Sequence, residues 1–115
     1  MIDDNFNLKL TSFIHSCNHK KASYSSIPMN RQLMAPEFWT HAYNPVDGDL
    51  FACGVMLFAL RTGSFPFYET TNRNSYYNKI IRGETEAFWA AHEKQKRLPP
   101  GFFSEDFKNL LNFMF

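Results

Sequence analysis

Residues 15–19 read His-Ser-Cys-Asn-His and therefore bring three kinds of potential metal ligand into one short stretch. Imidazole and thiolate are donors that zinc prefers, but a structural zinc site takes four ligands at characteristic spacings. No fourth ligand stands at a usual zinc spacing from this stretch. A solvated loop is the commoner explanation of such a pattern, and we expect no metal here.

Hydroxyl groups crowd the next stretch, where residues 23–26 read Ser-Tyr-Ser-Ser. Each hydroxyl is a possible phosphate acceptor, but serine-rich surface loops are common because connecting segments are polar by default. The whole of residues 15–34 is polar and irregular, which predicts a loop. Farther along, His92 falls near one face of an expected helix, where a histidine is more often packed or hydrogen-bonded than catalytic.

An apolar stretch in the middle of the chain predicts the central element of the fold. Residues 50–60 contain no charged side chain and no polar face, which predicts a core helix buried on all sides. We expect Asp47 or Asp49 to cap its first turn, and Gly63 to stop it in a left-handed conformation. Arg61 stands in the last turn, where a cation is favoured. The run is too short to span a bilayer, which takes about 20 residues.

The remaining elements are predicted from hydrophobic periodicity and from residues typical of turns and helix caps. Residues 6–10 alternate apolar and polar after a turn cluster at 3–5, which predicts a short strand. Helices are expected over residues 76–82 and 84–98. Ser104 is expected to cap a last helix with one apolar face. That face comprises Phe107, Leu110, Leu111 and Met114. The sequence thus predicts a mostly α fold with a short N-terminal β-hairpin remnant.

Three motifs in order and at suitable spacing resemble the large lobe of protein kinases. Residues 49–55 resemble the D-x-W-S-x-G-V signature of its central helix, residues 35–37 read A-P-E, and residues 62–67 are similar to T-G-x-x-P-F. Three segments of the tail resemble calmodulin-dependent-kinase-like serine/threonine kinases of the ciliate type. These segments are residues 76–81, 88–92 and 103–108.

The resemblance implies a partial protein kinase domain over residues 1–115. Its activation segment would cover residues 12–37, its central helix about residues 47–62, and further helices residues 76–115. The family activity is ATP-dependent phosphorylation of protein serine or threonine, so the resemblance implies ATP and Mg²⁺ as family cofactors.

The position of the metal-binding D-F-G motif departs from the family. The matching triplet here is Ser12-Phe13-Ile14, which keeps the Phe but neither the Asp nor the Gly. In kinases that aspartate holds the Mg²⁺ ions that bridge the ATP phosphates. A serine hydroxyl is a poor substitute for a carboxylate at a hard cation. Isoleucine also removes the backbone freedom of glycine. We therefore expect no cofactor on this chain.

The other family positions are structural. Ala35, Pro36 and Glu37 would anchor the activation segment, and Gly54 belongs to the central-helix signature. Asp49 would hydrogen-bond the backbone of the H-R-D catalytic loop. Two plainer interpretations stay open: Glu37 as an ordinary acidic residue at a helix start, and Asp49 as a helix cap.

The sequence contains no G-x-G-x-x-G, no H-R-D and no suitably placed phosphate lysine. Phosphoryl transfer depends almost wholly on these positioning and charge-stabilising parts, so we expect the chain to be inactive by itself and assign it no catalytic residue. Three interpretations remain: a kinase large-lobe fragment whose other parts lie upstream, a pseudokinase-type protein-binding module, or a truncated product without stable function.

The composition limits the classes of partner that we expect. The 115 residues carry a net charge of +1, which gives no electrostatic footprint for nucleic acid or an anionic membrane. The two cysteines make no disulfide framework, and the N-terminus resembles no signal peptide, so we expect a cytoplasmic protein. Its partner would be another protein or the missing upstream kinase segment. Without that segment, some apolar residues of the central helix should lack cover, namely several of Leu50, Phe51, Val55, Met56, Phe58 and Leu60.

Overall fold

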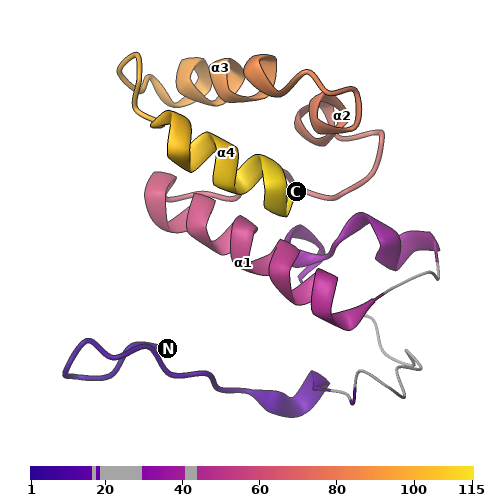
Figure 1. Ribbon diagram of the computed structural model, residues 1–115, viewed down its shortest axis with the longest axis vertical. Coiled ribbons are helices and arrows are strands. Elements are labelled where there is room, and N and C mark those ends of the chain that lie inside the picture. The colour runs from indigo at the N-terminus through magenta and orange to yellow at the C-terminus, as the bar shows by residue number, and fades with distance from the viewer. Residues whose placement is uncertain (17, 19–29, 41–43) are drawn as a thin grey trace.

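The described part of the chain is helical. The computed structural model describes residues 1–16, 18, 30–40 and 44–115. These residues form four α-helices in order: α1 (Pro45–Thr62), α2 (Ser75–Ile81), α3 (Thr85–Lys96) and α4 (Glu105–Met114) (Figure 1). Three short 3-10 helices precede them within the described ranges: η1 (Phe13–His15), η3 (Arg31–Leu33) and η4 (Pro36–Thr40).

The expected strand at the N-terminus is wrong. Among the described residues this region forms only an isolated antiparallel bridge, between Ile2 and Leu8. The turn between them is held by Asp3, whose Oδ1 accepts hydrogen bonds from the backbone N–H groups of Asn5 and Asn7 at 3.0 and 2.8 Å. A ladder fails to extend because a lone two-stranded hairpin is marginal in water, and Phe6, Leu8 and Leu10 are exposed.

Helix α1 starts and stops at residues suited to those positions. Asn44 is the N-cap, and its side-chain oxygen accepts from the Val46 N–H at 3.1 Å, so the expected cap by Asp47 or Asp49 is wrong. Pro45 follows at the first helical position, which fits its fixed φ. Gly63 ends the helix with φ 74°, as expected. The helix therefore begins two residues before the predicted bound.

Only one face of α1 is buried. Phe51, Val55 and Phe58 are at most 3% exposed, whereas Leu50 is 45% and Leu60 78% exposed. Burial on all sides was therefore the wrong expectation. The hydropathy of a helix shows what it could bury, but neighbouring elements decide how much they cover, and here they cover one side. The expected lack of cover holds for Leu50, Met56 and Leu60, and not for the phenylalanines and Val55.

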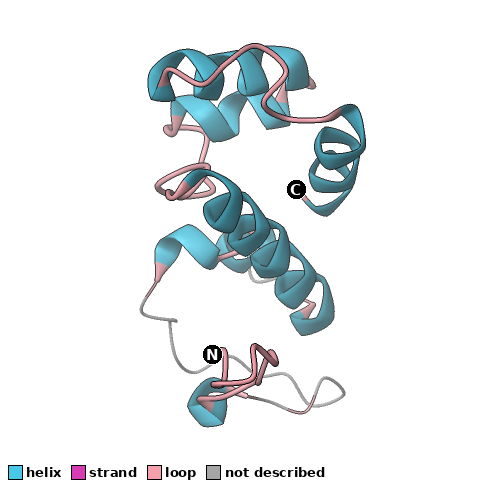
Figure 2. Ribbon diagram, turned by 90° about the vertical axis from the view of Figure 1, so that its left-hand side faces the viewer, coloured by secondary structure: helices cyan, strands magenta, loops and turns pink. Residues whose placement is uncertain are grey.

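The other helices supply that cover. Helix α4 packs on α1, and α2 packs on α3 (Figures 1 and 2). Residue Gly54 of α1 lets α4 come close: a Cβ atom at Gly54 would lie 3.0 Å from Met114 Cβ and 3.2 Å from Phe115 Cε1. Ser104 caps α4 as expected, because its Oγ accepts from the Phe107 N–H at 3.3 Å.

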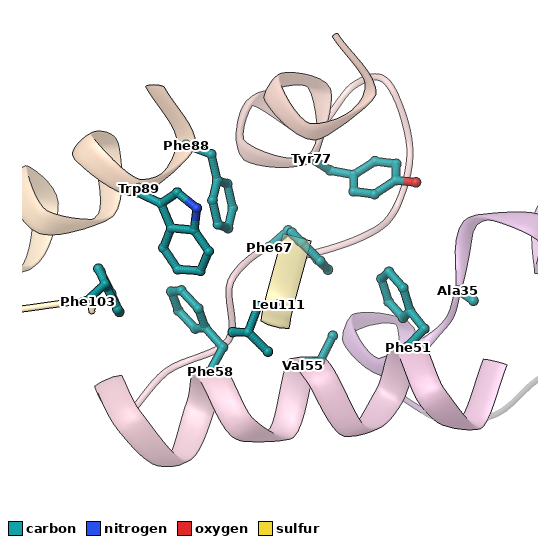
Figure 3. Close-up of a cluster of buried hydrophobic side chains, with 10 residues drawn as sticks. All are labelled: Ala35, Phe51, Val55, Phe58, Phe67, Tyr77, Phe88, Trp89, Phe103 and Leu111. Atoms are coloured by element: carbon teal, nitrogen blue, oxygen red, sulfur yellow. The ribbon is translucent and has the colours of Figure 1, made fainter. Parts of the chain in front are cut away.

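Aromatic rings fill the space where α1, α3 and α4 meet (Figure 3). Phe58 stacks on Phe103 with ring centroids 5.7 Å apart, and Trp89 lies 4.9 Å from the same ring. Trp89 Nε1 donates to Asn112 Oδ1 at 3.1 Å, so the indole's only polar group is satisfied. Each fully buried large apolar side chain stabilises the fold by roughly 1.5–3 kcal/mol. On the expected apolar face of α4, Leu111 is fully buried, but Leu110 is half exposed.

Candidate functional site

The triplet Ser12-Phe13-Ile14 lies on the surface. Ser12 precedes η1 with φ 62° and its side chain makes no capping hydrogen bond. All three residues are exposed, with Phe13 at 66% and Ile14 at 82%. A positive φ at a non-glycine residue such as Ser12 costs free energy, about 1–2 kcal/mol at ordinary residues. No described element packs on this triplet to make it a binding site.

The A-P-E residues, by contrast, are held firmly. Ala35 is 1% exposed and belongs to the core, and Pro36 begins η4 with Glu37 in its first turn. Thr70, from the loop before α2, ties this segment down: its Oγ1 donates to the Met34 carbonyl at 2.9 Å and accepts from Trp39 Nε1 at 2.8 Å. Thr70 is itself buried, and no sequence pattern had marked it.

Glu37 also influences α2. Burial raises the pKa of the Tyr77 hydroxyl to about 12, and the negative charge of Glu37 adds to this shift.

The two remaining family positions lie on opposite sides of α1. Asp49 is exposed, whereas Gly54 is buried beneath the end of α4. The structure therefore does not bring the predicted site residues together into one cluster.

A groove of about 1210 Å³ lies between α1, the loop over residues 63–68, and the facing parts of η3, α2 and α3. Its walls include Met56 and Leu60 of α1, together with Phe65 of the loop. Lys96 is the charged side chain among its lining residues. Such a mostly apolar cleft suits an apolar side chain or ring. No pattern in the sequence predicts this groove, because its walls come from separate segments.

His92 forms the deep wall of this groove. It is 2% exposed, stacks on Tyr76 at 4.3 Å and meets Phe58 edge-on at 4.8 Å. Within the part of the chain that the structure describes, neither ring nitrogen has a hydrogen-bond partner. Burial lowers the pKa of His92 to about 4. The nearby Pro66 carbonyl acts to raise this pKa, although its geometry is not that of a regular hydrogen bond, and the positive charge of Lys96 lowers the pKa further. The expectation of a packed histidine is confirmed.

The described residues do not fit a magnesium–nucleotide site. The position that would supply a metal carboxylate holds the exposed hydroxyl of Ser12. Among residues 1–16, 18, 30–40 and 44–115, no three His, Cys, Asp or Glu side chains lie together so as to hold a metal ion. The metal pattern at residues 15–19 lies partly outside the described residues, and the hydroxyls at 23–26 lie wholly outside them.

Comparison with protein-family models matches residues 1–115 to the protein kinase domain. The chain belongs to the protein kinase domain family. The match covers the three motifs at residues 35–37, 49–55 and 62–67, so they are parts of one kinase-domain sequence.

Curated relatives agree with this family. The chain is 30% identical to CBL-interacting serine/threonine-protein kinase 10 of Arabidopsis thaliana, over 85% of this chain and 22% of the relative. It is 27% identical to CBL-interacting protein kinase 19 of Oryza sativa subsp. japonica, over 97% and 20% respectively. The chain thus spans about a fifth of the length of these relatives. No solved structure matches it.

These findings make the chain a fragment of a serine/threonine protein kinase domain. The roles that the kinase resemblance gives to Ala35, Pro36, Glu37, Asp49 and Gly54 stay predictions. Within the described residues, no helix is both long and apolar enough to cross a membrane.

Proposed function

We propose that this kinase-domain fragment does not transfer phosphate by itself. Transfer requires Mg²⁺ held by a carboxylate, a lysine on the phosphates and a catalytic-loop aspartate. The sequence has no H-R-D and no Gly-rich loop, and Lys9 lies 3.4 Å from Asp3 Oδ2 on an exposed turn. The observation that carries the proposal is Ser12, a neutral and exposed hydroxyl at the position of the metal carboxylate.

A phosphotransfer assay tests this proposal. The full chain is incubated with ATP, Mg²⁺ and serine- and threonine-containing peptides, beside the variant Val55→Asp. Val55 is fully buried, so an aspartate there should unfold the chain and report any contaminating kinase. We expect equal background transfer from both proteins. Transfer by the native chain that is lost in Val55→Asp contradicts the proposal.

The finer family position is part of the proposal as well. Residues 76–81, 88–92 and 103–108 support a calmodulin-dependent-kinase-like chain of the ciliate type. ATP and Mg²⁺, the cofactors of the kinase family, would then bind a complete domain. A segment outside this sequence would supply the H-R-D loop and the Gly-rich loop of that domain. Reading the genomic sequence upstream of Met1 tests this: an in-frame H-R-D and Gly-rich loop support it, and an unrelated reading frame counts against it.

A second candidate function is protein binding of the pseudokinase type. The observation that favours it is the uncovered face of α1, where large apolar side chains meet solvent. Unpartnered apolar faces of this kind mark interaction sites or association-prone surfaces. A third interpretation, a truncated product without stable function, predicts no cooperative unfolding transition, so a thermal melt separates it from the other two.

A further inference from the structure

His92 is buried without the hydrogen bonds that a buried polar group normally makes. Its side chain is 2% exposed, and no described residue hydrogen-bonds either imidazole nitrogen. Because proteins pair the large majority of their buried polar groups, an unpaired imidazole in the wall of a groove calls for a partner. His92 lines the groove together with Pro66 and Lys96, so a molecule bound in the groove can supply the missing bond.

The surroundings of His92 decide which kind of bond is missing. Burial lowers the pKa of His92 to about 4, so at pH 7 the imidazole is neutral and has one N–H donor and one bare nitrogen acceptor. The nearby backbone carbonyl of Pro66 acts on this ring, and a carbonyl can only accept a hydrogen bond. We therefore assign the imidazole proton to the nitrogen on the Pro66 side. The other nitrogen is then an acceptor that needs an O–H or N–H donor.

Tyr76 covers the imidazole from the groove. Its ring stacks on His92 with centroids 4.3 Å apart and an interplanar angle of 26°. Tyr76 is only partly buried, and its hydroxyl donates to Gln95 Oε1 at 2.6 Å in an exposed hydrogen bond. Water competes for such an exposed bond, so this latch is weak and outward rotation of Tyr76 uncovers His92. The rings of Phe58 and Phe88, by contrast, belong to the core and stay in place (Figure 3).

The lining of the groove limits the class of ligand. Its walls include Phe65 and Pro66 and are mostly apolar, which suits an aromatic ring. Among the described lining residues no side chain is acidic, so an amine cation finds no opposite charge. A carboxylate presents only acceptors to the bare nitrogen of His92, which is an acceptor itself. A neutral ring with one hydroxyl meets both requirements.

We propose that the groove beside His92 binds a small neutral phenol, whose hydroxyl donates to the bare imidazole nitrogen and whose ring takes the place of the Tyr76 ring. The residues that carry this site come from α2, α3 and the loop at Pro66, so the site does not depend on the exposed face of α1. Binding involves neither ATP nor phosphate transfer and therefore goes beyond the proposed function.

Titration with phenol, and with anisole as the matched ring whose oxygen carries no proton, tests the site. The chain is labelled with ¹⁵N in its four histidines, and the His92 resonances are assigned by their absence from His92→Phe. We expect phenol to shift the bare-nitrogen resonance of His92 toward that of a hydrogen-bonded imidazole, and anisole to leave it in place. The absence of a phenol-dependent shift at His92 overturns the proposal.

Affinities measured on the native chain and on His92→Phe isolate the hydrogen bond. Comparing the two ligands on the two proteins cancels the difference in hydration between phenol and anisole. We expect the preference for phenol over anisole to fall about tenfold in His92→Phe. An unchanged preference, or benzoate bound to the native chain as tightly as phenol, overturns the proposal.

The role of Tyr76 as a lid has a separate test. Gln95→Ala removes the acceptor of the Tyr76 hydroxyl at an exposed position, so the lid should open more easily and the phenol affinity should rise a few-fold. Lys94→Ala changes an exposed neighbour outside the groove lining and should leave the affinity unchanged. Circular dichroism should show both variants folded. A phenol affinity that is the same in Gln95→Ala and Lys94→Ala overturns the proposal.

Discussion

His92 is a buried titratable group enclosed by aromatic rings, and no described residue hydrogen-bonds its imidazole nitrogens. Its pKa of about 4 lies below the ordinary value of 6.5, so the unfolded chain binds more protons between these values. The free energy of unfolding should therefore fall as the pH drops from about 6.5 to 4. The loss attributable to His92 is on the order of 3 kcal/mol.

Urea unfolding at several pH values, on the native chain and on His92→Phe, checks this prediction. Phenylalanine keeps an aromatic ring in the site but cannot take up a proton. We expect the variant to lose less stability than the native chain between pH 6.5 and 5. The other histidines are unchanged in both proteins, so the difference isolates His92. Parallel pH curves would show that its ionisation is not coupled to folding.

Gly54 marks the close contact of α1 with α4. Gly54→Val should lower the free energy of unfolding by about 1–3 kcal/mol, because the added carbons meet Met114 and Phe115 at 3.0–3.2 Å. Chemical denaturation at a few micromolar protein measures this. Cys53→Val, at the exposed neighbouring position, is the matched control and should change stability little. Equal effects at the two positions would refute a steric role for Gly54.

At the scale of elements, the segment before α1 depends on one buried hydroxyl. Thr70→Val keeps the shape of the side chain but removes the donor to the Met34 carbonyl and the acceptor for Trp39 Nε1. Leaving these partners unsatisfied should lower the free energy of unfolding by about 1–3 kcal/mol. Thr71→Val, whose hydroxyl donates to Glu69 nearer the surface, should lose less. Losses of similar size would count against a special role for Thr70.

The sequence predicted elements best where a local signal decides them. Gly63 ends α1 and Ser104 caps α4, because a left-handed turn and an N-terminal cap depend on residues within a few positions. Predictions failed where distant segments decide. The strand near Leu8 needed a longer pairing partner than the described residues supply, and the cover of α1 depended on where α2–α4 pack. The choice of Asn44 over Asp47 as cap was a local error of two residues in the helix start.

For the candidate site too, the sequence marked residues within local motifs and missed features formed by distant segments. The kinase resemblance predicted structural roles for Ala35, Pro36 and Gly54, and these roles stay predictions; the structure buries Ala35 and Gly54. No sequence pattern indicated Thr70 or the groove beside His92. Both depend on contacts between segments more than thirty residues apart, such as Thr70 with Met34, for which a single sequence carries no local pattern.

For the whole molecule, the exposed apolar side chains predict a native state that binds hydrophobic dye. Leu60 at 78% and Phe113 at 81% exposure are conspicuous among them. We expect dye fluorescence to rise with the folded chain, and the double variant Leu50→Lys with Leu57→Lys to reduce it without loss of helix signal. A cooperatively melting chain that binds no dye would show that these surfaces are covered in solution.

In the kinase resemblance Ser12 stands at the position of the metal carboxylate, so we expect this kinase-domain fragment not to hold ATP·Mg²⁺. Calorimetric titration of the chain with ATP, with and without Mg²⁺, tests this most directly. We predict no saturable, magnesium-dependent heat, because Ser12 replaces the metal carboxylate and stands exposed. Ser12→Asp should also fail to give phosphate transfer, since the sequence has no H-R-D. Micromolar, magnesium-dependent binding by the native chain would contradict the account.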